Sequence, residues 1–144
     1  MRIEVRPFQL ADHPGLVAAV NSVCAEGMMR TPRFIPTPAW EHALAQPDCP
    51  CHLLLIAAEG PQVVGWCRLF PTDGEALELG IGVLGPYRRQ GLGRALLEAA
   101  LDWARGMPVV LETRTDNIPA IRLFTRFGFR IVGQEDGHWQ LEYP

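Results

Sequence analysis

The sequence predicts a single domain of the α/β (α+β) class, built on a mixed, mostly antiparallel sheet with flanking helices. The chain has 144 residues, 48% of them hydrophobic and 20% charged, which suits one buried core. Residues 51–84 hold three β-rich runs separated by short turns, the pattern of an antiparallel meander. A helical pattern over 91–105 then lies between two strand patterns, which predicts a right-handed parallel crossover. We therefore expect residues 1–144 to form one domain with a central parallel strand pair.

The first fifty residues predict one strand, two helices and a loop. The stretch "IEVRPF" (3–8) alternates as a strand does, and apolar residues within 10–25 recur at helical spacing. The following "EGMMRTPRFIPTPAW" contains three prolines and predicts a loop. Residues 37–44, "TPAWEHAL", predict a short helix with Thr37 as its N-cap.

The rest of the chain alternates between strands and helices. A stripe of apolar residues marks the helix over 91–105, and Gly128 ends the helix that begins at 117. The expected strands are 51–58, 63–70, 75–84 and 107–113, followed by "FRIVGQ" and "HWQLEY".

Composition excludes several classes of partner. The formal net charge is −3, which argues against nonspecific binding to nucleic acid. The N-terminal residues carry charges throughout and lack the apolar core of a signal peptide. No run approaches the roughly 20 apolar residues that a membrane span needs. We expect a cytoplasmic protein that binds neither nucleic acid nor membranes.

The cysteines predict no metal site. The run Cys49-Pro-Cys51-His52 has metal-ligating residue types, but the sequence has no second pair of closely spaced cysteines to complete a zinc site. We expect no metal, and reduced, partly buried thiols at all four cysteines.

Two glycine patterns that could hold phosphate overlap after residue 79. Residues 80–85 spell Gly-x-Gly-x-x-Gly, but Gly80 and Gly82 lie inside the expected strand, whereas a dinucleotide fingerprint follows its strand. Residues 88–93 spell Arg-x-x-Gly-x-Gly between a strand and a helix. There, backbone N–H groups and the helix dipole would favour an anion such as pyrophosphate. A glycine-rich loop with solvated arginines fits the same residues.

The glycines of strand 75–84 suggest a groove. Alternation places Glu78, Gly80 and Gly82 on one face and Leu77, Leu79, Ile81 and Val83 on the core face. Bare backbone would then floor a groove that runs from the phosphate cradle to Glu78. Alternatively, the glycines admit bulky neighbours from a packed helix.

Two blocks resemble the GNAT superfamily of acetyl-CoA-dependent N-acetyltransferases. "RRQGLGRALL" (88–97) is similar to its pyrophosphate loop, and "LETRTDNIPAIRLFTRFGF" (111–129) to its second conserved block. The resemblance covers residues 51–142, and the first fifty residues fit only in the order of their elements.

The resemblance implies acetyl-CoA as cosubstrate, held by the middle of the chain. Strands 75–84 and 107–113 would splay apart to admit it. The loop 25–40 and the final strands would shape the acceptor pocket, and family members often form dimers through those strands, which leaves a homodimer open. The backbone of Ile81, Gly82 and Val83 would bind the pantetheine and polarise the thioester. The pyrophosphate would bind to Arg88, Arg89, Gln90, Gly91, Leu92, Gly93 and Arg94, while Asn117 and Phe124 would border the pantetheine arm.

The resemblance also implies the catalytic groups. Family members use a glutamate as general base at one of two positions, which here are Glu78 and Glu112. We prefer Glu78 because it lies on the same face of its strand as the glycines. Phe124 stands where many members have a tyrosine acid, so Tyr143 is the better candidate acid unless the thiolate leaves unaided. The expected function is acetyl transfer to a primary amine of a small molecule or peptide, by direct attack on the thioester. The alternative is a catalytically silent acyl-CoA-binding domain.

Overall fold

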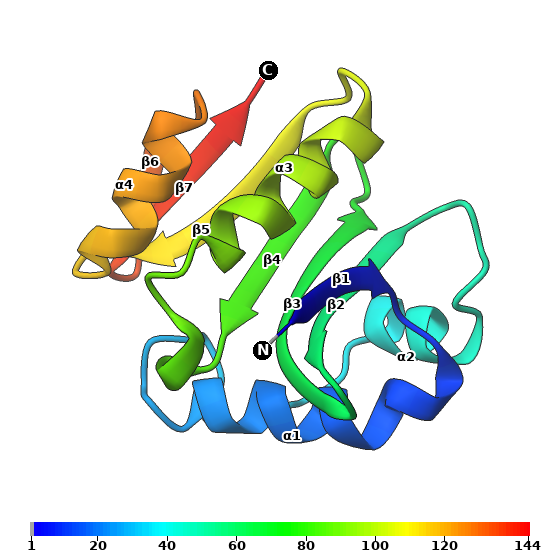
Figure 1. The fold of residues 1–144 in the computed structure, drawn as a ribbon. Coiled ribbons are helices and arrows are strands. Elements are labelled where there is room, and N and C mark those ends of the chain that lie inside the picture. The colour runs from blue at the N-terminus through cyan, green and yellow to red at the C-terminus, as the bar shows by residue number, and fades with distance from the viewer. Residues whose placement is uncertain (1) are drawn as a thin grey trace.

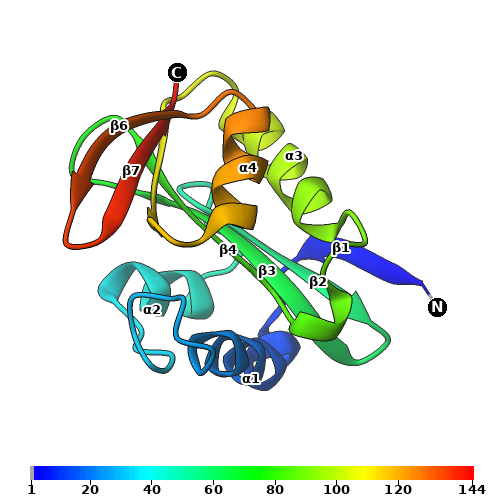
Figure 2. The same ribbon diagram turned by 90° about the vertical axis from the view of Figure 1, so that its left-hand side faces the viewer.

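The computed structural model describes residues 2–144, which form one seven-stranded sheet with helices on both faces (Figures 1 and 2). The strands are β1 (Ile3–Pro7), β2 (Leu53–Glu59), β3 (Gln62–Pro71), β4 (Leu77–Val83), β5 (Val109–Arg114), β6 (Arg130–Glu135) and β7 (His138–Tyr143). Their order across the sheet is β1-β2-β3-β4-β5-β7-β6. All neighbours are antiparallel except β4 and β5, which confirms the predicted class and the parallel pair.

The helices begin close to where the sequence predicts. They are α1 (His13–Cys24), α2 (Pro38–Ala45), α3 (Leu92–Ala104) and α4 (Ile118–Arg126), with short 3₁₀ turns at Leu10–Asp12 and Gly85–Tyr87. Thr37 caps α2 as expected, because its hydroxyl accepts the N–H of Trp40 (3.3 Å). None of the helices within residues 2–144 is long and apolar enough to cross a membrane.

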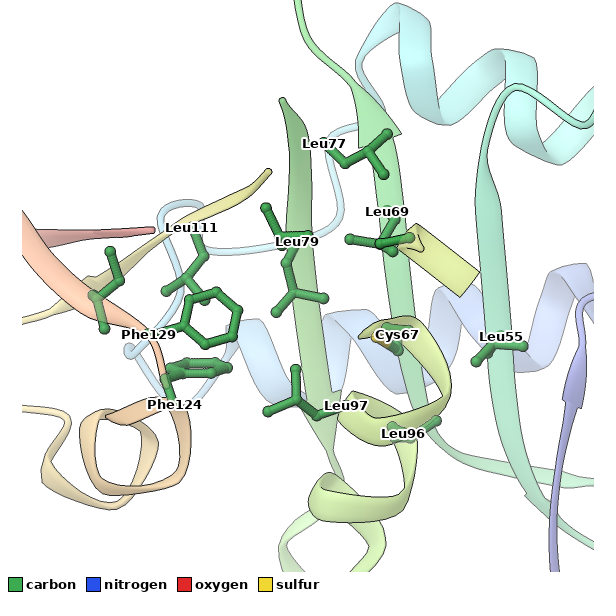
Figure 3. Close-up of a cluster of buried hydrophobic side chains, with 14 of the residues drawn as sticks. Leu55, Cys67, Leu69, Leu77, Leu79, Leu96, Leu97, Leu111, Phe124 and Phe129 are labelled. Carbon is green, nitrogen blue, oxygen red and sulfur yellow. The ribbon is translucent and has the colours of Figure 1, made fainter. Parts of the chain in front are cut away.

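Each face of the sheet carries its own hydrophobic core. Helices α3 and α4 cover one face, where Leu96 and Leu97 pack on the strands and Phe124 lies beside Phe129 (Figure 3). Helices α1 and α2 cover the other face around Trp66 and other buried residues (Figure 2).

The loop before α2 packs against this second core. Met29 and Phe34 lie against it, and Trp40 at the start of α2 is buried within it. These side chains therefore anchor the loop as well as bordering the cavities described below.

The two parallel strands separate after only two residue pairs. Leu77 pairs with Val109 and Glu78 with Val110, and β4 and β5 have no further register partners. Beyond this point β5 pairs with β7 along its whole length, while β4 stays with β3 (Figure 1). The predicted splaying of the parallel pair is thus confirmed.

The cysteines differ in part from the expectation. Cys24 and Cys67 are free and buried. Cys49 and Cys51 instead form a disulfide, so the prediction of four reduced thiols was wrong for this pair. The turn that leads into β2 brings their Cα atoms to 5.4 Å, within the range that a disulfide spans.

Candidate active site

The pairing register decides which backbone groups of β4 face the gap between β4 and β5. The N–H of Leu84 donates toward β3 (2.9 Å), whereas the N–H of Leu77 donates to the carbonyl of Pro108 on the β5 side (2.8 Å). Because these directions alternate along a strand, odd-numbered residues of β4 direct their backbone toward β5. Ile81 and Val83 lie beyond the last β4–β5 pair, so their N–H groups face the gap without a strand partner.

The gap leads to a helix N-terminus that has no side-chain cap. Gly91 is the N-cap of α3, with a φ of 79°, and a Cβ there would meet no atom within 4 Å. The first helical hydrogen bond runs from Ala95 to the Gly91 carbonyl (3.0 Å). The N–H groups of Leu92, Gly93 and Arg94 therefore have no partner within the helix, and such groups attract anions.

Three arginines surround this N-terminus. Arg88 forms a two-pronged ion pair with Glu26 (2.7 and 2.9 Å) and donates through Nε to the Val83 carbonyl (2.9 Å). Arg94 pairs with a glutamate one turn further on (3.3 Å). Arg89 takes part in none of the ion pairs found within residues 2–144. An anion arriving here would meet Arg89 directly and compete with Glu26 for Arg88.

One groove of about 700 Å³ joins these features. Asn117 and Phe124 border it from α4. Asn117 also caps α4 by accepting the N–H of Ala120 (3.4 Å), and Phe124 is almost wholly buried. Gln90 does not line the groove, because its amide turns back to the Pro86 carbonyl (3.3 Å). The predicted cofactor residues that do line it are Ile81, Gly82, Val83, Arg88, Arg89, Gly91, Leu92, Gly93, Arg94, Asn117 and Phe124.

The glycine face of β4 is not bare. A Cβ on Gly82 would lie 2.6 Å from Cζ2 of Trp66, and a Cβ on Gly80 would lie 2.6 Å from Nε of Arg68. The predicted floor of bare glycine backbone is therefore wrong, although Glu78 and Gly80 do line one cavity. The glycines do admit bulky neighbours, but these come from the adjacent strand β3 and not from a helix. The position of Gly80 and Gly82 in mid-strand also excludes the dinucleotide fingerprint.

Both candidate glutamates lie on one side of the sheet. Leu77 and Leu79 of β4 and Leu111 of β5 belong to the α3–α4 core, so Glu78 and Glu112 alternate to the opposite face. The two glutamates line one cavity of about 210 Å³, which Phe124 and Asn117 also border.

Each glutamate has an arginine partner that the sequence did not suggest. Arg68 of β3 donates to Glu78 (3.2 Å) and stacks over the ring of Phe70 (4.8 Å). Arg30, from the loop after α1, forms an ion pair with Glu112 through two nitrogens that share one carboxylate oxygen. The hydrogen bond to Glu112 raises the pKa of Arg30. No local pattern pairs residues 82 positions apart, so only the fold brings this pair together.

A second cavity, of about 500 Å³, extends from Glu78 toward α2. Its walls are aromatic, with Phe34, Trp40, Trp66 and Phe70. The expected pocket loop thus contributes to the walls, through Met29, Arg30, Thr31, Phe34, Ile35, Thr37, Ala39 and Trp40.

The structure does not bring Tyr143 to the glutamates. Tyr143 pairs with Val109 at the start of β5 and packs on Phe129 (5.2 Å between ring centroids), on the α3–α4 face. Because Glu78 lies on the opposite face, the expected acid role has no support from the geometry. Tyr87 is also directed elsewhere, because its hydroxyl donates to Glu59 (2.9 Å), which raises its pKa.

Solved structures share this fold. The acetyltransferase of GNAT family from Streptococcus pneumoniae superimposes with a TM-score of 0.85 at 23% identity, over 99% of both chains. The structure of yncA from Salmonella typhimurium with its cofactor acetyl-CoA gives a TM-score of 0.79 at 21% identity, over 99% of this chain and 94% of that one.

Sequence comparison shows the family. The model of the acetyltransferase (GNAT) family matches residues 24–129. The N-alpha-acetyltransferase RimI of Mycobacterium tuberculosis is 39% identical over 102 residues, which are 68% of this chain and 63% of that protein. The match thus spans less than two thirds of that relative's length. This chain belongs to the acetyltransferase (GNAT) family.

Proposed function

We propose that this chain transfers an acetyl group from acetyl-CoA to a primary amine of a small molecule or peptide, by direct attack on the thioester. The observation that carries the proposal is the parting of β4 and β5. It leaves the N–H groups of Ile81 and Val83 without strand partners in the same groove as the N-terminus of α3. An extended ligand with amides along its length and pyrophosphate at one end matches this row of donors.

The residues around Gly91 fit a pyrophosphate. The open space at the Gly91 Cβ position leaves room for phosphate oxygens close to the backbone. The N–H groups that begin α3 would donate to those oxygens, and Arg89 would add a charge-assisted hydrogen bond. Arg88 would exchange Glu26 for phosphate.

The N–H of Val83 would stabilise the thioester oxygen as negative charge develops on it. Removing one such donor typically costs about 10²- to 10³-fold in rate. The Val83 carbonyl is already held by Arg88 (2.9 Å), which fixes the peptide group that follows Val83. Arg88 therefore links the end of β4 at Val83 to the residues proposed to hold the pyrophosphate.

Glu78 would accept the proton of the attacking amine. It lines both the cavity that it shares with Glu112 and the aromatic cavity, whereas Glu112 does not line the aromatic one. Arg68 contacts one oxygen of Glu78, and the side chain is half exposed, so the second oxygen can receive a proton directly or through water. Glu112 is the alternative base, but Arg30 holds it through two nitrogens.

No tyrosine is needed at the position of Phe124. Its ring would pack against the pantetheine without donating a proton. The leaving thiol has a pKa of about 8.5, so its thiolate is a fair leaving group near neutral pH.

The aromatic walls and the relative RimI both bear on the acceptor. RimI is named as an N-alpha-acetyltransferase, which favours a peptide N-terminus as the amine. The cavity of about 500 Å³ beside Glu78 would accommodate an apolar first side chain of such a peptide. A homodimer through the final strands remains a prediction from the family.

The test compares Glu78→Gln with Glu112→Gln in steady-state kinetics, with acetyl-CoA binding followed by calorimetry. We expect Glu78→Gln to lower kcat by about 10²- to 10⁴-fold and to leave acetyl-CoA affinity unchanged. A loss of kcat confined to Glu112→Gln would instead identify Glu112 on β5 as the base. Tight acetyl-CoA binding by the wild type, without turnover on a broad panel of amines and peptides, would instead indicate a silent binding domain.

A further inference from the structure

Two cysteines and two histidines gather away from the groove. His42 lies in the last turn of α2, and Cys49, Cys51 and His52 lie in the segment that leads into β2. The four ligand atoms all lie within 4.8 Å of one another. The sequence shows three of these residues together, but the fourth comes from a helix, and only the fold supplies it.

We propose that these four residues bind a Zn²⁺ ion when the cysteines are reduced. Zinc bonds of about 2.3 Å to sulfur and about 2.05 Å to nitrogen give tetrahedral sulfur–nitrogen edges of about 3.6 Å. Sγ of Cys51 lies 3.5 Å from Nε2 of His42 and 3.4 Å from Nδ1 of His52. Two edges of the tetrahedron are therefore already at the required length.

His52 gives an independent indication of a ligand. The residue is 94% buried, and its Nε2 atom has no hydrogen-bond partner within residues 2–144. The other ring nitrogen, Nδ1, is directed at the sulfur of Cys51. A buried imidazole normally has both nitrogens satisfied, whereas His52 leaves Nε2 without a partner and turns Nδ1 toward the cluster of cysteine and histidine ligand atoms.

The backbone also favours a thiolate in the cluster. The N–H of Cys51 donates to the sulfur of Cys49 (3.4 Å), and a donor to sulfur stabilises its negative charge. Two thiolates and two neutral imidazoles balance the charge of Zn²⁺, and a tetrahedral S₂N₂ set is typical of zinc.

Metal binding requires reduction of the Cys49–Cys51 disulfide. A phosphine or dithiol reductant supplies two electrons, and with two protons from water the S–S bond becomes two thiols. Zn²⁺ then displaces both thiol protons and accepts one lone pair from each thiolate and from one nitrogen of each histidine. The oxidised form has no thiolate to offer, so disulfide and zinc exclude each other.

The site is structural and not catalytic. Four protein ligands fill the tetrahedron and leave no open position for a substrate. The ion would tie the end of α2 to the start of β2. The cluster lies next to the aromatic cavity, because the ring of His52 is 6.0 Å from the ring of Phe70, between centroids, and Phe70 lines that cavity.

The experiment titrates the full chain with Zn²⁺ under anaerobic conditions, against a chelator of known affinity. We expect the protein treated with a phosphine to bind one equivalent with a sub-micromolar Kd, and the air-oxidised protein to bind none. Cys49→Ser and His42→Ala should each weaken binding by at least about a hundredfold, since even residues behind the ligands contribute about 10- to 100-fold. His13→Gln, which removes a histidine outside the cluster, is the matched control and should bind as the wild type does.

Cobalt gives a second readout that does not depend on a variant. Co²⁺ added to the reduced wild type should produce thiolate-to-cobalt charge-transfer absorption together with the visible bands of tetrahedral cobalt, and Zn²⁺ should abolish both. The proposal would be overturned by absence of these bands, by absence of tight zinc binding in the reduced wild type, or by wild-type affinity in Cys49→Ser and His42→Ala. Because His42 is exposed and Cys49 is half-buried, both variants are expected to fold, and circular dichroism checks this.

Discussion

Replacing Gly91 with valine tests whether the glycine at the start of α3 holds acetyl-CoA, as we propose. The φ of 79° is costly for any residue with a Cβ, by about 1–2 kcal/mol and more for a β-branched one. With an unfolding entropy of about 2.1 cal/mol/K per residue, that loss lowers the melting temperature of this chain by roughly 3–7 °C. The added side chain also enters the open space next to the N–H groups of α3. We expect acetyl-CoA affinity to fall at least about tenfold, ~1.4 kcal/mol.

Gly106 provides the matched control. Its φ is 85°, a Cβ there also meets no atom within 4 Å, and it follows α3 at the end remote from the groove. Gly106→Val should therefore lower the melting temperature by a similar amount and leave acetyl-CoA affinity unchanged. Calorimetric titration of both folded variants decides the matter. Equal affinity in Gly91→Val and Gly106→Val would refute the assignment of the cradle.

Further predictions concern residues around the groove and the N-terminal strand. Glu26→Gln should tighten acetyl-CoA binding by up to about fivefold, because it frees Arg88 from an exposed ion pair; weaker binding in the same titration would contradict this. At pH values below the thiol pKa, Tyr143→Phe should lower kcat by less than about tenfold. A hundredfold loss in a folded variant would show that Tyr143 is the general acid after all. The hydrogen bond from Arg6 lowers the pKa of Asp12, so its stabilisation is fully present above the unfolded value of 3.8 and is lost as the pH falls through the folded pKa. Asp12→Asn should therefore reduce the free energy of unfolding by about 1–3 kcal/mol at pH 7, and the difference from wild type should shrink as the pH falls below 3.8; urea unfolding that shows a constant difference would exclude the linkage.

Local patterns were sufficient for most of the secondary structure. Thr37 and Asn117 begin helices because their side chains accept a backbone N–H in the first turn, an interaction that spans only three residues. Gly91 opens α3 because the chain needs a positive φ there. The parallel pair also followed from the order of strand, helix and strand. The parting of that pair was implied only by the family resemblance.

The face of β4 shows where local pattern failed. Alternation correctly separated Glu78 from Leu77 and Leu79, but it did not reveal what covers Gly80 and Gly82. The covering side chains, Trp66 and Arg68, come from the neighbouring strand, so their position depends on register and not on spacing within β4.

Residues a few positions apart were enough to predict the helices and strands, the family blocks and the glycine pattern at the start of α3. Features that depend on strand register or on contacts between distant segments could be seen only in the folded structure. Register directs the N–H groups of Ile81 and Val83 into the gap, which no periodicity within the strand can predict. Folding also brings His42 against the cysteine cluster, because packing places the end of α2 beside the segment that enters β2. The sequence shows which side chains are available, whereas the packing of the sheet and helices determines which residues each side chain contacts.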